Sequence, residues 1–244
     1  MGLAEAIDAI WAVKDAKDSV DSIKEFTEIG VRMSKRDPAG IKEAELSIFT
    51  NARLTPVVSV LQAQNKAVLA AKATKAQWPA SNSLPAYEKA IKAAETYGHD
   101  SAEAKAAIEA YRNVLIQYST RLNNALKPLR KLKGNFPATS LAATSLMSYG
   151  KMMVTAFERI ATFPSGQQAE FFVLSRTAAS VRDEASKLST NLKAVQGQLD
   201  AAISEGTDLF KQNQEWILFT YKSAMASPQS LSANRKVKGR PRKK

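Results

Sequence analysis

Residues 168–225 decide the fold, and they read QAEFFVLSRTAASVRDEASKLSTNLKAVQGQLDAAISEGTDLFKQNQEWILFTYKSAM. Large apolar side chains recur here mostly at intervals of three, four or seven residues: Phe171, Leu174, Val181, Leu188, Leu192, Val195, Leu199, Ile203, Phe210 and Ile217. This spacing places them on one stripe of an α-helix, and its heptad character is typical of helices that pack lengthwise. The sequence predicts one long helix, which Gly197 and Gly206 each weaken locally.

The same apolar spacing recurs along the rest of the chain, and no run of strict alternation marks a β-strand. Pro56 predicts a kink or break at residues 52–55, because a proline inside a helix removes a backbone hydrogen bond. Gly98 has the position of a helix C-cap, and Asp100 with Glu103 has the spacing of a capping box. Further helices are therefore predicted over residues 3–34, 38–78, 86–97, 100–127 and 139–161.

Two stretches between these helices are predicted to be irregular from their Pro, Gly and Ser content: residues 79–85 as a loop and residues 127–137 as a basic connector. The Ala, Ser and Thr content of residues 139–161 leaves room for a neighbouring helix to approach closely. A helix of forty residues spans about 60 Å, which exceeds the width of a compact domain of this size. The expected fold is all-α, an elongated antiparallel bundle of about five or six helices, two or three of them long.

The chain has 244 residues, with 35 Lys and Arg against 23 Asp and Glu, one His and no Cys. A chain without cysteine has no disulfide, no thiolate nucleophile and no Cys-ligated metal. His99 lies in a predicted turn with no second histidine or triad partner nearby in the sequence. Phosphate-cradling glycine loops and the motifs of zinc proteases, serine hydrolases and EF-hands are also absent. The sequence predicts a protein that is not an enzyme and that has no metal site and no cofactor.

The net charge of +12 is unevenly distributed. Residues 235–244 hold seven basic side chains and no acidic one, so residues 1–234 hold 28 basic against 23 acidic side chains. No apolar spacing remains after Ser227. The predicted organisation is therefore a helical bundle over residues 1–226 and a flexible basic tail over residues 227–244.

The tail contains Lys238-Gly239-Arg240-Pro241-Arg242-Lys243-Lys244, which resembles the AT-hook, a short Gly-Arg-Pro motif that binds A·T-rich minor grooves. The resemblance covers these seven residues alone. It implies that Arg240 and Arg242 enter the narrow groove, that Pro241 keeps the backbone extended, and that Gly239 avoids the groove wall. The predicted nucleic-acid contacts are Arg235, Lys236, Lys238, Gly239, Arg240, Pro241, Arg242, Lys243 and Lys244.

The tail departs from the usual motif at Val237-Lys238, where a more basic or proline-containing lead is common, and it holds one copy only. The expected binding is therefore weak and sensitive to salt. The same charge cluster also suits nuclear import, another polyanion or an anionic membrane surface. DNA binding would place the chain in a nucleoid, nucleus or virion; otherwise its location is left open. Neither an N-terminal signal peptide nor a transmembrane helix is expected.

A second basic group, Lys127, Arg130, Lys131 and Lys133, lies in the predicted connector. It is interpreted either as a secondary phosphate-contacting patch or as solvated charges that favour a helix C-terminus.

Two hypotheses for function follow. The first is a non-enzymatic structural or assembly protein that associates with itself or with protein partners through its long helices and contacts DNA or another polyanion through its tail. The alternative is a membrane-active helical protein, such as a component of an α-helical pore-forming toxin, that uses a hairpin over residues 136–174. That alternative requires Lys151, Glu158 and Arg159 to face water or one another.

Overall fold

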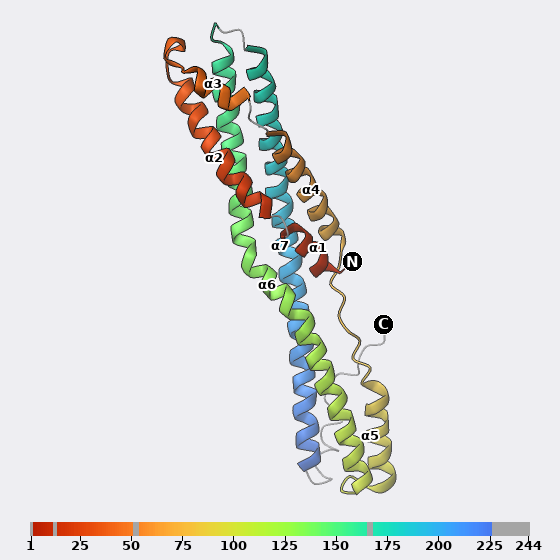
Figure 1. The fold of residues 1–244 in the computed structure, drawn as a ribbon. Helices are drawn as coiled ribbons and strands as arrows, with labels where there is room; N and C mark the ends of the chain where they lie inside the picture. Colours follow the sequence, from red (N-terminus) through yellow and green to blue (C-terminus); the bar gives the residue numbers. More distant parts are fainter. Residues whose placement is uncertain (1, 12–13, 51–53, 165–167, 226–244) are drawn as a thin grey trace. The chain divides into compact units, whose positions relative to one another are not determined.

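A computed structural model describes residues 2–11, 14–50, 54–164 and 168–225. Every regular element in these ranges is a helix, and none of them contains a β-strand, which confirms the all-α fold (Figure 1). The elements are α1 (Leu3–Trp11), α2 (Lys14–Ser34), a 3-10 turn (Pro38–Gly40), α3 (Glu43–Thr50), α4 (Leu54–Ala73), α5 (Leu84–Tyr97), α6 (Ala102–Ala161) and α7 (Gln168–Met225).

The helices form two compact units, each assembled from two separate stretches of chain. The first unit comprises Met1–Ala76 and Leu129–Ala201, and the second comprises Gln77–Pro128 and the chain from Ala202 onward. The long helices α6 and α7 each contribute to both units.

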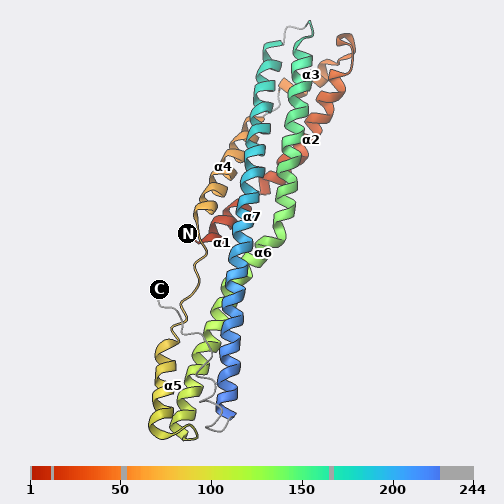
Figure 2. The ribbon, with the colours of Figure 1, turned by 180° about the vertical axis from the view of Figure 1, so that it is seen from behind.

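In the first unit, α1 packs against α4, α4 lies along α7, and α2 lies along α6 (Figures 1 and 2). Edge-to-face and tilted aromatic contacts link four of these helices. The ring of Phe49 on α3 lies 5.3 Å from that of Phe157 on α6 and 6.3 Å from that of Phe26 on α2. Phe157 also lies 6.4 Å from Phe171 on α7. Three of the four rings are fully buried, so this cluster is the centre of the first core.

The buried face of each long helix follows a seven-residue repeat. The α6 series is Leu115, Leu122, Leu129, Phe136, Ala143, Gly150 and Phe157, and the α7 series is Phe171, Ala178, Ala185, Leu192, Leu199, Gly206, Asn213 and Thr220. The repeat keeps one face of each helix turned inward along its length. It confirms the predicted helix over residues 168–225, although three predicted stripe members, Leu174, Ile203 and Phe210, are only half-buried.

The helices α6 and α7 run antiparallel. Residues that meet across the pair lie at nearly equal distances along the sequence from residues 165–167, as Ser175 and Glu158 do close to them and Lys133 and Asp200 do far from them. In the second unit, Gln214 donates to Ser119 in the same register.

The predicted connector at residues 127–137 is wrong, because α6 runs through it without a break. Proline inside a helix costs about 3 kcal/mol or more. Burial of one large apolar side chain contributes about 1.5–3 kcal/mol, and this segment buries three, Leu129, Leu132 and Phe136. This gain is of the same size as the cost of Pro128 and Pro137 and offsets it, so the helix continues.

Two other predicted boundaries move, and the ends of the first predicted helix are confirmed. The helix expected over residues 3–34 begins at Leu3 and ends at Ser34, and residues 12–13 within it lie outside the described residues. The break expected at residues 52–55 falls partly on residues 51–53, which also lie outside the described residues, whereas Leu54 and Thr55 already belong to α4. The start expected at Pro38 is a 3-10 turn, and α4 ends at Ala73, before Trp78.

The turn between α5 and α6 confirms one predicted cap and corrects the other. Gly98 has a φ of 84°, the left-handed conformation that glycine adopts without strain. The N-cap of α6 is Ser101, whose Oγ accepts a 3.1 Å hydrogen bond from the backbone of Ala104, and not Asp100. Serine one residue nearer the helix satisfies the free N–H group directly.

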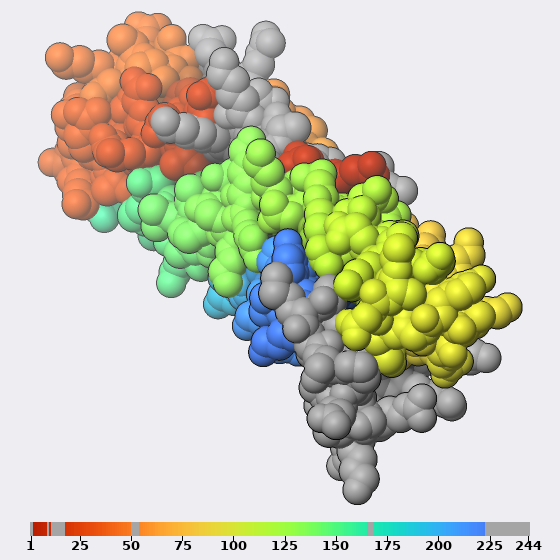
Figure 3. Space-filling model, turned by 90° about the horizontal axis from the view of Figure 1, so that it is seen from below, coloured from red at the N-terminus to blue at the C-terminus, as the bar shows by residue number. Residues whose placement is uncertain are grey.

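In the second unit, α5 packs against the pair formed by the first part of α6 and the last part of α7 (Figure 3). Tyr87 of α5 lies 5.5 Å from Tyr111 and 6.3 Å from Trp216, measured between ring centroids. Asn213 is buried at a heptad position, and its Nδ2 donates 2.7 Å hydrogen bonds to the carbonyl of Leu115 and to Ser119 Oγ. This core is therefore small, aromatic and partly polar.

The core phenol of Tyr111 gives this unit a pH dependence that we predict as follows. Burial raises the pKa of Tyr111 from 10.0 to about 12, and neighbouring Tyr87 adds a smaller effect in the same direction. The phenol of Tyr111 ionises at a lower pH in the unfolded chain than in the folded chain. Its contribution to the free energy of unfolding is therefore complete below pH 10 and is lost as the pH rises through 12. Burial also raises the pKa of Tyr118, so an ultraviolet titration should show more than one phenol that ionises late, and Tyr111→Phe should remove one of them. Superimposable curves for the two proteins would contradict the assignment.

Candidate functional site

The nine tail residues predicted to contact nucleic acid, from Arg235 to Lys244, lie outside the described residues. The last described helix, α7, ends at Met225. The tail therefore enters the argument through its sequence alone.

The second predicted basic group lies on α6, where Lys127, Arg130, Lys131 and Lys133 are all exposed. Lys127 belongs to the second unit, and Arg130, Lys131 and Lys133 belong to the first. Lys133 Nζ lies 2.7 Å from Asp200 Oδ1, so an acidic side chain already neutralises it. The group stays a candidate phosphate-contacting patch in which Lys133 is already paired.

The positive charge of the helical body is concentrated on the hairpin of α6 and α7 within the first unit. Residues 129–201 hold nine basic and five acidic side chains. The ion pairs described within this stretch are Lys133–Asp200, Arg182–Asp183 and Lys187–Glu184. The surplus leaves exposed cations such as Lys151, Arg176 and Lys193 along the hairpin.

A groove between α6 and α7 collects part of this charge. It has a volume of about 420 Å³ and is lined by Met147, Ser148, Lys151, Arg182, Asp183 and Ser186. Arg182 Nε donates a 2.8 Å hydrogen bond to Asp183 Oδ1. That hydrogen bond and the charge of Asp183 raise the pKa of Arg182, so the guanidinium stays protonated.

The groove depends on a close contact between the two helices at Gly150. A Cβ atom at Gly150 would lie 2.8 Å from the backbone nitrogen and 2.9 Å from the Cα of Arg182. Only a residue without a side chain fits this contact, which confirms the predicted close approach of a helix to residues 139–161. The groove itself was not predicted, because the sequence does not show which residues of α7 face Gly150.

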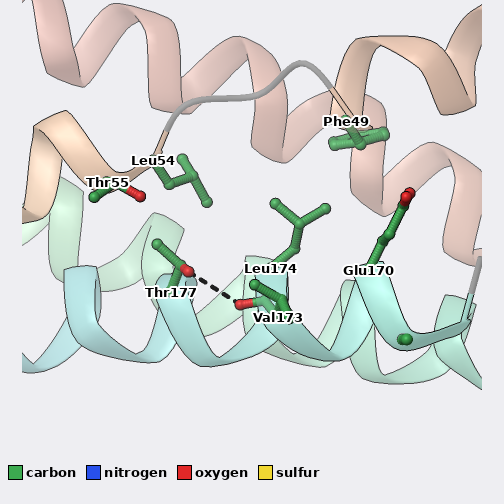
Figure 4. Close-up of a pocket in the computed structure, with 8 residues that line it drawn as sticks. Phe49, Leu54, Thr55, Glu170, Val173, Leu174 and Thr177 are labelled. Carbon is green, nitrogen blue, oxygen red and sulfur yellow. Dashed lines mark hydrogen bonds between the residues drawn. The ribbon is translucent and has the colours of Figure 1, made fainter.

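A second cavity, of about 390 Å³, lies where α3, α4 and the start of α7 meet (Figure 4). Its lining combines apolar side chains, such as Phe49 from α3, Leu54 from α4 and Val173 from α7, with the threonines Thr55 and Thr177 and the carboxylate of Glu170. Thr177 does not offer its hydroxyl to a ligand, because it donates a 3.0 Å hydrogen bond to the carbonyl of Val173. The cavity therefore offers few groups that would orient a substrate.

Polar contacts between α4 and α7 have a structural role. Asn65 Nδ2 donates to Glu184 Oε2 at 2.8 Å, and Lys72 Nζ donates to Asn191 Oδ1 at 3.2 Å. A hydrogen bond from Lys187, reinforced by that from Asn65, lowers the pKa of Glu184. The carboxylate of Glu184 is therefore held ionised in a helix contact and is not poised for proton transfer.

The hairpin of the membrane-active alternative has its largest apolar side chains in the core. Phe157 and Phe171 are buried, whereas Phe172 and Val173 are exposed at the start of α7. Lys151, Glu158 and Arg159 are all exposed. None of the described helices combines the length and apolar character needed to cross a membrane.

No three His, Cys, Asp or Glu side chains of the described residues are grouped so that they would hold a metal ion. His99 lies in the turn between α5 and α6. Comparisons with models of protein families, with curated proteins and with solved structures give no match to this chain.

Proposed function

We propose that the chain is a non-enzymatic helical structural or assembly protein that contacts DNA or another polyanion through residues 235–244. The observation that carries the proposal is the charge of this segment, which holds seven of the 35 basic side chains and no acid around Gly239-Arg240-Pro241. The proposed absence of catalysis rests on the lack of cysteine, of a second histidine and of any catalytic motif in the sequence.

The charge of the second unit supports a separate role for the tail. Its described residues, 77–128 and 202–225, carry eight basic and eight acidic side chains and are therefore neutral. The tail follows this neutral unit with an uncompensated charge of +7. Neutralisation of about six phosphates would give a plot of log K against log salt a slope of about −5.

The long helices support the assembly part of the proposal. The helices α6 and α7 have 60 and 58 residues, and their buried positions follow the repeat that is typical of helices that associate lengthwise. A helical body with a cationic tail suits a structural protein of a virus or an accessory protein of a nucleoprotein complex.

Retention on immobilised A·T-rich duplex tests the tail. Deletion of residues 235–244 should abolish salt-sensitive retention, because the deletion removes all seven cations of the segment. Arg240→Ala/Arg242→Ala should remove the preference for A·T-rich over G·C-rich duplex, since these two arginines are the proposed groove contacts.

The matched control is Lys243→Ala/Lys244→Ala, which removes the same charge from proposed phosphate contacts. It should reduce the magnitude of the salt slope by about two while it keeps the A·T preference. Unchanged retention after the deletion would refute the proposal. Equal binding to both duplexes by the unmodified chain would reduce it to a general polyanion contact.

The membrane-active alternative is supported by four exposed large apolar side chains within residues 136–174: Leu141, Met152, Phe172 and Val173. Dye release from anionic liposomes that survives deletion of the tail would favour it over DNA contact.

A further inference from the structure

The groove between α6 and α7 has the donors that a phosphate group needs. Gly150 lets α6 touch the backbone of α7 at Arg182, so the next residue of α6, Lys151, lines the same groove as the guanidinium. A planar guanidinium beside a flexible ammonium is a common arrangement around phosphate oxygens.

Two hydroxyl groups in the lining remain available to a ligand. Threonine hydroxyls in these helices mostly donate to the carbonyl four residues earlier, as those of Thr144, Thr155 and Thr190 do. Within the described part of the chain, the hydroxyls of Ser148 and Ser186 make no such bond, and both residues are exposed in the groove wall.

The local charge favours an oxyanion held by several donors. Within the described ranges, no carboxylate forms an ion pair with Lys151, while Arg182 uses Nε for Asp183 and keeps its terminal nitrogens for other partners. The carboxylate of Glu158 also acts on Arg182 from α6. The two acids offset much of the positive charge, so affinity must come from directional hydrogen bonds and will be modest.

We propose that this groove binds a phosphate group, with Arg182 and Lys151 as charged donors and Ser148 and Ser186 as hydroxyl donors. The proposal rests on the proposed function, because the phosphate would belong to the DNA that the tail contacts. The groove then gives the helical body its own contact with the DNA backbone.

Methyl NMR of the full chain tests the groove directly. The chain has six methionines, of which Met147 lines the groove and Met33 is fully buried elsewhere in the first unit. Titration with inorganic phosphate, at ionic strength held constant with chloride, should move the Met147 signal to saturation and leave the Met33 signal in place. No movement of the Met147 signal would overturn the proposal.

Two arginine variants distinguish a specific phosphate site from a general effect of positive charge. Arg182→Gln should weaken the phosphate response about tenfold or more, because it removes a charge-assisted donor. Arg176→Gln, which removes an exposed arginine of α7 outside the groove lining, should leave the response unchanged. An equal loss in the two variants would show a charge effect alone and would refute the site.

Titration with duplex DNA distinguishes failure of the groove proposal from failure of the tail proposal. In the unmodified chain, duplex should move the Met147 signal and compete with phosphate. Arg240→Ala/Arg242→Ala should keep the phosphate response, whatever its effect on duplex binding. A response to phosphate without a response to bound duplex would overturn the assignment to DNA while the tail proposal stood.

Discussion

Replacement of Phe157 by alanine should lower the free energy of unfolding by about 3–5 kcal/mol, the range for loss of a fully buried aromatic side chain. Phe157 is 1% exposed, and its ring contacts those of Phe49 and Phe171. The substitution leaves a cavity where α3, α6 and α7 meet. Urea denaturation followed by circular dichroism measures the loss.

The matched control for this prediction is Phe172→Ala. Phe172 is 55% exposed and follows directly after Phe171 on α7, so its removal should change stability by no more than about 0.5 kcal/mol. Losses of similar size for Phe157→Ala and Phe172→Ala would contradict the described core.

Substitution of Gly150 by alanine should destabilise the chain, by about 1–3 kcal/mol, although alanine is the better helix former. The added methyl group would meet backbone atoms of Arg182, which cannot move away as the end of a side chain can. The substitution therefore forces α6 and α7 apart. Thermal or urea unfolding of the purified variant shows the sign of the change.

Two other glycines of the same helices provide controls of opposite sign. Gly134 on α6 and Gly197 on α7 have nothing within 4 Å of an added Cβ atom. Gly134→Ala and Gly197→Ala should each stabilise the chain by about 0.5–1 kcal/mol, because alanine restricts the unfolded backbone more than glycine does. Stabilisation by all three substitutions would show that the helices do not touch at Gly150.

The sequence predicts helices well where the apolar spacing is regular and poorly where proline and glycine conflict with that spacing. The bounds of α7 follow from its heptad pattern, and Gly98 marks the end of α5. The prediction fails at residues 127–137, where two prolines and a glycine suggested a connector and continued burial of leucines decides for a helix. Local composition gives the cost of continuing the helix through proline and glycine, whereas the gain from burial depends on tertiary contacts.

The candidate groove lies beyond sequence prediction for a related reason. The spacing of small residues indicates that α6 allows close approach, but Arg182 becomes a groove residue only through the register of α7. That register follows from the packing of α7 against α6 and from contacts such as that of Lys133 on α6 with Asp200 on α7. The tail motif, in contrast, can be predicted from the sequence, because it consists of seven consecutive residues.

The first unit is assembled from two stretches of chain that residues 77–128 of the second unit separate, and this order affects synthesis. The helices α1 to α4 leave the ribosome before the segments of α6 and α7 that cover them. Phe49 on α3, for example, packs in the core with Phe157 and Phe171, which are synthesised more than a hundred residues later. The apolar faces of α1 to α4 therefore stay open to solvent until the nascent chain extends past residue 201. Folding of this unit is expected to be late and to benefit from chaperones that shield such faces.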